Sequence, residues 1–186
     1  MDVAEELFIA KGVGQTTIDD IVAGAGVAKG TFYLYFKSKD EILSALRTKF
    51  VTMCLDRIDA AVMKQAADDW QGRLRAWIGA AINAYLDHVR LHDTVFHDYR
   101  LQNRGMKIGN MAVANLAELL KAGAAARAWR IPDPALTAVF LFNGLHAVVD
   151  DAIARKNNDR AALVDLVERL SSAALQRPQL AAASAR

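Results

Sequence analysis

The segment 29–36 brings an ammonium group, a glycine and several hydroxyl groups together at helical spacing. Phe32 and Phe36 lie four residues apart, so on a helix they share one face and can both be buried. The residues that then face outward are Gly30, Thr31, Tyr33 and Leu34. A helix packed on every side would not need this many hydroxyl groups, nor a lysine at its start. The pattern therefore predicts a short helix with a polar face left open for a ligand.

That outward face suits insertion into the major groove of DNA, where base pairs display hydrogen-bond donors, acceptors and the thymine methyl group. Lys29 and Thr31 can bond base edges or phosphates. Gly30 permits close approach, and Leu34 can touch a thymine methyl group. These four residues are the candidate base-reading set.

Hydroxyl and ammonium groups flanking the same segment can donate to the sugar-phosphate backbone, which fixes the register of a protein on duplex DNA. Tyr33, Tyr35 and Lys39 suit this role, and for Tyr35 we expect a half-buried ring with its hydroxyl in water. Thr17 would approach from the other side, because its hydroxyl and the free N–H groups at its helix start form an anion site. All four residues are candidate phosphate contacts.

The charge distribution supports this interpretation, although the formal net charge is only +2. Residues 1–27 carry Lys11 against five carboxylates, which sums to −4. Residues 28–50 carry five lysine or arginine residues against Asp40 and Glu41, which sums to +3. Phosphate contact requires such a local basic surface, because the release of condensed counterions drives much of the binding.

Apolar residues recur at helical spacing over nearly the whole chain, without the sustained alternation typical of a half-buried strand, so we predict an all-α fold. The first helix ends at Gly12, a residue type that tolerates the left-handed turn after a helix. Thr17 caps a second short helix that ends at Gly26. Because the segment 29–36 follows within three residues, the pattern is that of a helix-turn-helix. A long helix then runs from residue 39 into the sixties.

Beyond residue 66 the helices are longer, and we predict them at about 68–90, 92–101, 104–128, 134–156 and 160–176. Asp133 can cap the fourth of these, with Pro134 at its first position, where the missing N–H costs nothing. The last two helices should form an antiparallel hairpin. Gly144 and an apolar stripe make this hairpin the candidate dimer-forming bundle, although packing within one chain would explain the same stripe. The stripe consists of Leu163, Leu166, Val167 and Leu170.

An ordered set of residues between positions 4 and 46 carries a family resemblance. The set is Ala4, Leu7, Phe8, Gly12, Thr16, Thr17, Ile21, Ala25, Gly26, Val27, Gly30, Thr31, Phe32, Tyr33, Tyr35, Phe36, Ser38, Lys39, Ile42 and Leu43. It resembles the DNA-binding region of the tetracycline-repressor (TetR) family. The resemblance implies a homodimeric transcriptional regulator, usually a repressor, with a three-helix helix-turn-helix domain at 1–46 and a helical ligand-binding and dimerisation domain at 47–186.

The same resemblance implies partners and residue roles. The implied partners are a near-palindromic double-stranded operator and a small-molecule effector that releases the protein from it. The family positions that contact phosphates correspond here to Thr17, Tyr33 and Lys39. The start of the third helix, which reads bases in the family, corresponds to Lys29, Gly30 and Thr31. The family's first helix usually begins one to two turns earlier, so either the natural chain continues upstream of Met1 or a basic DNA-binding arm is missing.

The implied effector pocket would lie between C-terminal helices, where aromatic walls and a few polar groups usually form such sites. Asn143 and His146 fall on an otherwise apolar helix, and a polar pair there must find hydrogen-bond partners or a ligand. The candidate pocket residues are Trp77, Tyr85, Phe96, Tyr99, Phe142, Asn143 and His146. Plain core packing is the alternative for the aromatic members.

Composition excludes several other classes. Hydrophobic residues make up 53% of the chain and charged residues 24%, which excludes a disordered protein. The single cysteine, Cys54, excludes an intramolecular disulfide framework and is interpreted as a buried, inert thiol. No apolar run approaches the roughly 18 residues of a membrane helix, and the N-terminus is acidic where a signal peptide would be basic. We therefore expect a cytoplasmic protein with no membrane partner.

We expect no enzyme, no cofactor and no metal site, but two alternatives stay open. One is a metal-binding or catalytic helical bundle, because His88 and His92 stand four residues apart and Asp93 or Asp150 could supply an oxygen ligand. The other is an interaction module that uses the helix-turn-helix to bind a protein rather than DNA. Metal analysis of the purified protein tests the first, and a mobility shift with duplex DNA tests the second.

Overall fold

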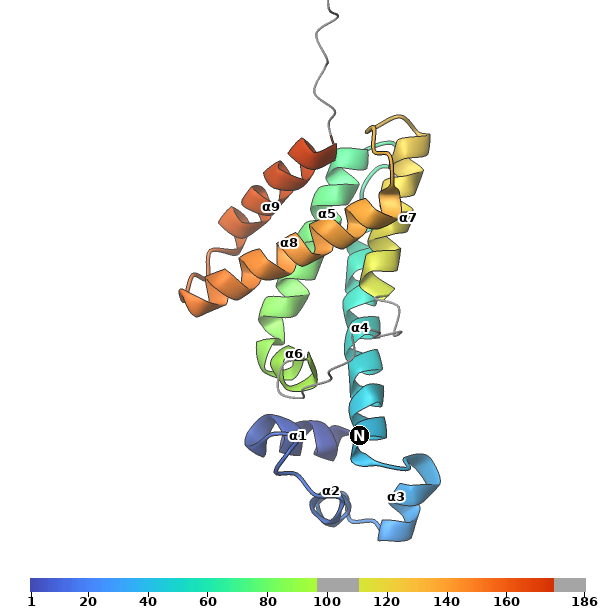
Figure 1. The fold of residues 1–186 in the computed structure, drawn as a ribbon, viewed down its shortest axis with the longest axis vertical. Coiled ribbons are helices and arrows are strands. Elements are labelled where there is room, and N and C mark those ends of the chain that lie inside the picture. Colours follow the sequence, from blue (N-terminus) through green and yellow to red (C-terminus); the bar gives the residue numbers. More distant parts are fainter. Residues whose placement is uncertain (97–110, 176–186) are drawn as a thin grey trace, which may run out of the picture. The chain divides into compact units, whose positions relative to one another are not determined.

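The structure, a computed structural model, describes residues 1–96 and 111–175. Within these two ranges every regular element is an α-helix, which confirms the predicted all-α fold (Figure 1). The described residues form two compact units, the first from residues 1–56 and 84–96 and the second from residues 57–83 and 111–175. The first unit thus extends past residue 46, where the sequence places the boundary between DNA-binding and ligand-binding functions, and that functional boundary stays a prediction.

The first unit contains the predicted helix-turn-helix. Its helices are α1 (Asp2–Lys11), α2 (Ile18–Ala25), α3 (Lys29–Tyr35), the first part of α4 (Lys39–Met63) and α6 (Val89–Phe96). Gly12 and Gly26 end α1 and α2 with φ angles of 83° and 65°, which glycine adopts without a Cβ clash. The helix starts and ends read from the sequence in this region are therefore confirmed to within one or two residues.

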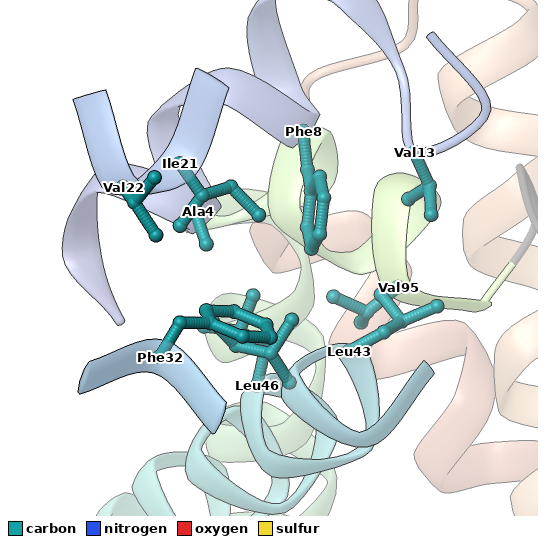
Figure 2. Close-up of a cluster of buried hydrophobic side chains, with 10 residues drawn as sticks. Ala4, Phe8, Val13, Ile21, Val22, Phe32, Leu43, Leu46 and Val95 are labelled. Atoms are coloured by element: carbon teal, nitrogen blue, oxygen red, sulfur yellow. The ribbon is translucent and has the colours of Figure 1, made fainter. Parts of the chain in front are cut away.

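Apolar side chains from these helices form one buried core (Figure 2). Phe32 of α3 is only 5% exposed, and Phe36 is partly buried against the same core. The predicted inward face of the segment 29–36 is thereby confirmed. The buried members are Ala4, Phe8, Val13, Ile21, Val22, Phe32, Ile42, Leu43, Leu46 and Val95. Cys54 of α4 is half-buried, so the expectation of a fully buried thiol is wrong.

The second unit carries the longer helices of the chain. They are the end of α4, most of α5 (Trp70–Asp87), α7 (Met111–Ala125), α8 (Pro134–Ala154) and α9 (Arg160–Leu175). The Asp133 carboxylate accepts a hydrogen bond from the Leu136 N–H at 2.9 Å, and Pro134 opens α8, as the sequence predicts. α7 packs on α8 and α8 on α9, which confirms the predicted hairpin of the last two helices (Figure 1).

A polar bridge on the surface of this unit joins α5 to α9. The Arg75 guanidinium lies 2.5 Å from an Asp165 carboxylate oxygen and also bonds Glu168. The Gln71 amide donates to Glu168 at 3.0 Å and to the Ser172 hydroxyl at 2.7 Å. Together these contacts fix α9 along α5.

α8 corrects one expectation from the sequence. It is 21 residues long and reaches a mean hydropathy of 1.4, so the described part of the chain contains one helix long and apolar enough to cross a membrane, judged by length and composition alone. Only 28% of its apolar window is buried. Phe140 and Leu136 are 68% and 65% exposed, and a protein partner can cover an apolar face of this kind.

The end of α7 is closed by Trp129, whose buried indole donates from Nε1 to the Leu120 carbonyl at 2.7 Å. The ring lies so close to Gly123 that a Cβ added there would be 2.1 Å from it. We expect Gly123→Ala to lower the free energy of unfolding by about 1–3 kcal/mol, because the ring must leave a packed site. Urea unfolding followed by tryptophan fluorescence measures this.

Gly79→Ala is the matched control for that substitution. A Cβ at Gly79 would meet Val164 at 3.8 Å, an ordinary contact, so alanine there should be neutral or stabilise the helix by up to about 1 kcal/mol. A Gly123→Ala protein as stable as the wild type would contradict the close packing of the indole.

Candidate nucleic-acid interface

The turn before α2 is held by a reciprocal capping box. The Thr17 hydroxyl accepts a hydrogen bond from the Asp20 N–H at 3.1 Å, and the Asp20 carboxylate accepts from the Thr17 N–H at 2.8 Å. The same carboxylate lies 2.7 Å from the Thr17 hydroxyl. Two backbone donors at the helix start are thus satisfied locally, which explains why the chain begins a helix here.

The Asp20 carboxylate also places a negative charge at the start of α2. Lys11 lies 2.8 Å from it, and hydrogen bonds from Lys11 and Thr17 hold the pKa of Asp20 far below its ordinary value. Because the pKa of Asp20 is lowered, its ionised carboxylate stabilises the folded state at every pH above the ordinary pKa of aspartate. This stabilisation is lost only in strong acid. The anion at the Thr17 N–H is therefore the chain's own carboxylate, and the Asp20 N–H, one of the helix-start groups expected to be free, is bonded to the Thr17 hydroxyl. Contact of Thr17 with phosphate stays a prediction.

α3 leaves its predicted outward face open. Leu34 is 82% exposed and Tyr33 50% exposed, although both are large and largely apolar. Gly30 is exposed and Thr31 is half-buried. Tyr35 is 75% exposed, so the expectation that its ring is half-buried is wrong. The first unit therefore presents hydroxyl groups, a leucine and a glycine side by side on one short helix.

Lys29, at the start of α3, is paired within the chain. Its ammonium lies 2.7 Å from a carboxylate oxygen of Asp19 in the first turn of α2. The hydrogen bond and charge of Asp19 raise the pKa of Lys29. Sequence reasoning singled out Lys29 but missed this partner. The signal was available, since Asp19 and Asp20 are acidic residues in the first turn of a helix that leads into the basic segment.

Lys39, at the start of α4, reaches back to the loop between α1 and α2. Its Nζ donates to the carbonyl oxygens of Val13 at 2.5 Å, Gly14 at 3.3 Å and Thr16 at 2.8 Å. An ammonium has three N–H donors, so these three acceptors account for all of them. The phosphate contact predicted for Lys39 stays a prediction, and it requires the ammonium to leave or share at least one carbonyl.

The predicted effector-pocket residues are divided between the two units. In the first unit, Tyr85 is buried and its ring centroid lies 3.8 Å from that of His92, which also packs on Phe50 and Phe96. This aromatic cluster surrounds a histidine that is 6% exposed. Tyr99 lies outside the described residues.

The other candidates belong to the second unit. Trp77 is 1% exposed and donates from Nε1 to Asn115 at 2.8 Å, while Asn115 donates to Asp59 at 2.9 Å. Phe142 stacks on His146 at 4.2 Å between ring centroids. Asn143 is exposed and donates to the Val139 carbonyl, so it finds a hydrogen-bond partner within its own helix, which is one of the two outcomes expected for it. Membership of an effector pocket stays a prediction for these residues.

A groove that sequence reasoning did not identify lies between α5 and α9, with a volume of about 470 Å³. It follows small residues at helical spacing on α5, a pattern that could have indicated a close helix approach. Its lining residues are Gln65, Gly72, Arg75, Ala76, Gly79, Asn83, Arg160, Ala161 and Val164. Arg160 donates to Asn83 at 3.2 Å across it.

His88 and His92, which the sequence offered as possible metal ligands, have different surroundings. Nδ1 of His92 lies 3.3 Å from the Asp93 carboxylate, and Nε2 of His88 is buried with no hydrogen-bond partner among the described residues. Among residues 1–96 and 111–175, no group of three or more histidine, cysteine, aspartate or glutamate residues is arranged to hold a metal ion.

Known proteins are similar to this chain in sequence. Residues 1–46 match the family described as bacterial regulatory proteins, tetR family. The chain is 34% identical over 87 residues to the HTH-type transcriptional regulator YerO of Bacillus subtilis, covering 44% of this chain and 28% of YerO. It is 32% identical over 85 residues to EthR of Mycolicibacterium smegmatis, covering 46% of this chain and 39% of EthR. The aligned region therefore spans about a third of these relatives' length.

Solved structures resemble the whole fold. A tetR-family transcription regulator from Shewanella sp. PV-4 superimposes with a TM-score of 0.76 at 19% identity, covering 95% of this chain and 96% of that one. FadR from Bacillus subtilis, solved in complex with stearoyl-CoA, gives a TM-score of 0.74 at 23% identity, covering 91% and 94%. A complex of SmeT with triclosan gives 0.70 at 21% identity, covering 96% and 90%. At these identities the similarity demonstrates a shared fold.

Proposed function

We propose that this protein is a ligand-responsive, DNA-binding transcriptional regulator, because its residues 1–46 match the tetR family of bacterial regulatory proteins. It acts as a repressor that binds a near-palindromic operator as a homodimer and is released by a small-molecule effector. The observation that carries this proposal is the outward face of α3, where Tyr33, Leu34 and Tyr35 are 50%, 82% and 75% exposed. Large apolar and aromatic side chains exposed together on one short helix indicate a binding surface.

α3 is the recognition helix of this proposal. Lys29, Gly30, Thr31 and Leu34 face base edges in the major groove, and Thr17, Tyr33, Tyr35 and Lys39 contact the backbone. In a two-fold dimer, two copies of α3 enter successive major grooves roughly 34–36 Å apart. Selecting duplexes from a random-sequence pool and measuring their mobility shift tests this. A protein that retains no duplex at any salt concentration contradicts the proposal and favours a protein-binding module.

Two isosteric substitutions separate backbone contact from base reading. We expect Tyr33→Phe to weaken binding to every duplex about tenfold, because a hydrogen bond to a charged phosphate is worth about 1.5 kcal/mol or more. Thr31→Val should instead change which base pair is preferred at one position of the selected duplex, by about 1–3 kcal/mol of discrimination. Repeating the selection with each variant measures both effects. A uniform loss for Thr31→Val would contradict its base-reading role.

Exposed apolar residues on α8 and α9 support the homodimer. Leu163 and Val167 of the predicted stripe are buried within the chain, whereas Leu166 and Leu170 are 38% and 57% exposed. On α8, Leu136, Val139 and Phe140 are exposed as well. A second copy that covers these two helices would form a four-helix bundle. Sedimentation equilibrium should therefore give about twice the chain mass of 20.3 kDa, and a monomer at micromolar concentration contradicts this assignment.

The effector binds the second unit in this proposal. Stearoyl-CoA and triclosan, which occupy FadR and SmeT, are the first probes to use. All three tryptophans, Trp70, Trp77 and Trp129, lie in the second unit, so their emission reports on that unit alone. A probe that releases the selected duplex should change this emission at the same concentration. Release of the duplex without any change in tryptophan emission would indicate that the effector does not bind next to Trp77.

The proposal assigns no catalysis. Members of this family are transcriptional regulators rather than enzymes. A regulator of chromosomal genes works where its operator lies, and we therefore assign the protein to the cytoplasm.

A further inference from the structure

The exposed ion pair between Asp19 and Lys29 joins the two helices of the helix-turn-helix. Asp19 lies in the first turn of α2 and Lys29 opens α3. The two charged atoms are 2.7 Å apart, and the side chains are 72% and 53% exposed. Both partners therefore stand on the open surface of the first unit, next to the outward face of α3.

An ammonium in this position can still bind DNA. It has three N–H donors, and one bond to Asp19 leaves two for acceptors on a base edge such as N7 and O6 of guanine. Asp19 raises the pKa of Lys29, so the side chain remains a cation. The tether limits where the ammonium can go, because a lysine side chain otherwise samples many rotamers.

The pair also changes the charge that the surface offers to phosphates. A lysine already neutralised by a carboxylate releases little net counterion when DNA binds, whereas a free lysine that neutralises one phosphate changes the slope of log K against log [salt] by about 0.9. Binding to DNA without the operator sequence rests mainly on contacts with phosphates. The tether therefore weakens non-specific binding more than operator binding.

We propose that Asp19 is a specificity-determining residue of the DNA-binding surface, whose carboxylate holds the Lys29 ammonium at the start of α3 and withholds it from the phosphates of non-operator DNA. This inference rests on the proposed function. It adds a carboxylate to a surface that was assigned only basic, hydroxyl and apolar groups.

The chain offers a charge-matched control at Asp2, which pairs with Lys49; Lys49 also bonds Glu5 and so keeps a partner when Asp2 is neutralised. The charged atoms of Asp2 and Lys49 are 2.8 Å apart, and their side chains are 85% and 51% exposed. Asp2→Asn removes the same charge as Asp19→Asn, but from α1 rather than from the helix-turn-helix. A difference between the two variants cannot therefore come from the net charge of the protein.

The test measures the affinity of the full chain for two duplexes of equal length between about 50 and 200 mM KCl. One duplex is selected by the wild-type protein from a random pool, and the other has a scrambled sequence. We expect Asp19→Asn to bind the scrambled duplex more tightly, with a salt slope steeper by about 0.9 per protomer, and to lose part of its preference for the selected duplex. Asp2→Asn should match the wild type.

Adding Lys29→Met to Asp19→Asn tests whether Lys29 is the cation responsible for the steeper salt slope. If Lys29 is the released cation, the double variant should return to a salt slope no steeper than that of the wild type. Equal effects of Asp2→Asn and Asp19→Asn, a steeper slope that persists in the double variant, or an unchanged Asp19→Asn protein would each overturn the inference. A wild-type protein that retains no duplex from the random pool would instead overturn the proposed function.

Discussion

Replacing Phe32 with alanine is expected to lower the free energy of unfolding of the helix-turn-helix unit by about 3–5 kcal/mol, the usual cost of removing a buried phenylalanine. Phe32 is the buried residue of α3, and its ring lies 5.8 Å from that of Phe36 and 5.5 Å from that of Tyr33. α3 spans only Lys29–Tyr35, and a helix this short has little stability of its own. Loss of this single anchor should therefore release the whole recognition helix from the core.

Hydrogen exchange measured by mass spectrometry resolves that effect by region. Peptides from α1 to α3 should exchange faster in Phe32→Ala, and binding to the selected duplex should be lost. Leu34→Ala is the matched control, because Leu34 lies two residues away on the same helix and is 82% exposed. Its effect on stability should stay within about 0.5 kcal/mol. Unchanged protection of α3 in Phe32→Ala would show that the ring does not anchor the helix.

Local signals explain why the helix-turn-helix could be predicted from the sequence. The capping box of Thr17, the left-handed Gly26 and the four-residue spacing of Phe32 and Phe36 each act within one helical turn of the residue concerned. Such signals need no knowledge of which helices meet. The exposure of Leu34 followed from the same spacing, because a helix with one buried face must turn its other face outward.

Contacts between residues on different helices explain what could not be predicted. The aromatic pocket candidates were chosen by residue type, but the partner of each ring depends on which helices pack together. Tyr85 therefore meets His92 in the first unit, while Trp77 meets Asn115 in the second. Tyr35 was placed half inside because its amphipathic ring fits either environment. Likewise, the acidic first turn of α2 indicated a partner for the basic segment, but only the turn geometry decides that Asp19 is the residue that pairs with Lys29.

The structure gives Lys39 a second role beside the phosphate contact predicted for it, because this lysine bonds a distant segment of the chain. Its Nζ bonds carbonyl oxygens of Val13, Gly14 and Thr16, 23–26 residues earlier in the chain. We expect Lys39→Met to lower the free energy of unfolding of the first unit by about 3 kcal/mol, because a hydrogen bond to a charged group contributes about 1.5–3 kcal/mol and several are lost together. Chemical denaturation followed by circular dichroism measures this loss.

Lys37→Met is the control, because it removes an equal charge two residues away from an exposed position and should change stability by less than about 0.5 kcal/mol. Salt titration of DNA binding then separates the two roles of Lys39. A phosphate contact would reduce the salt slope by about 0.9 per protomer, whereas a purely structural clamp would lower affinity at every salt concentration and leave the slope unchanged. A Lys39→Met protein as stable as the wild type would show that the carbonyl clamp does not hold the loop before α2. In that case the ammonium would be free to serve the DNA alone.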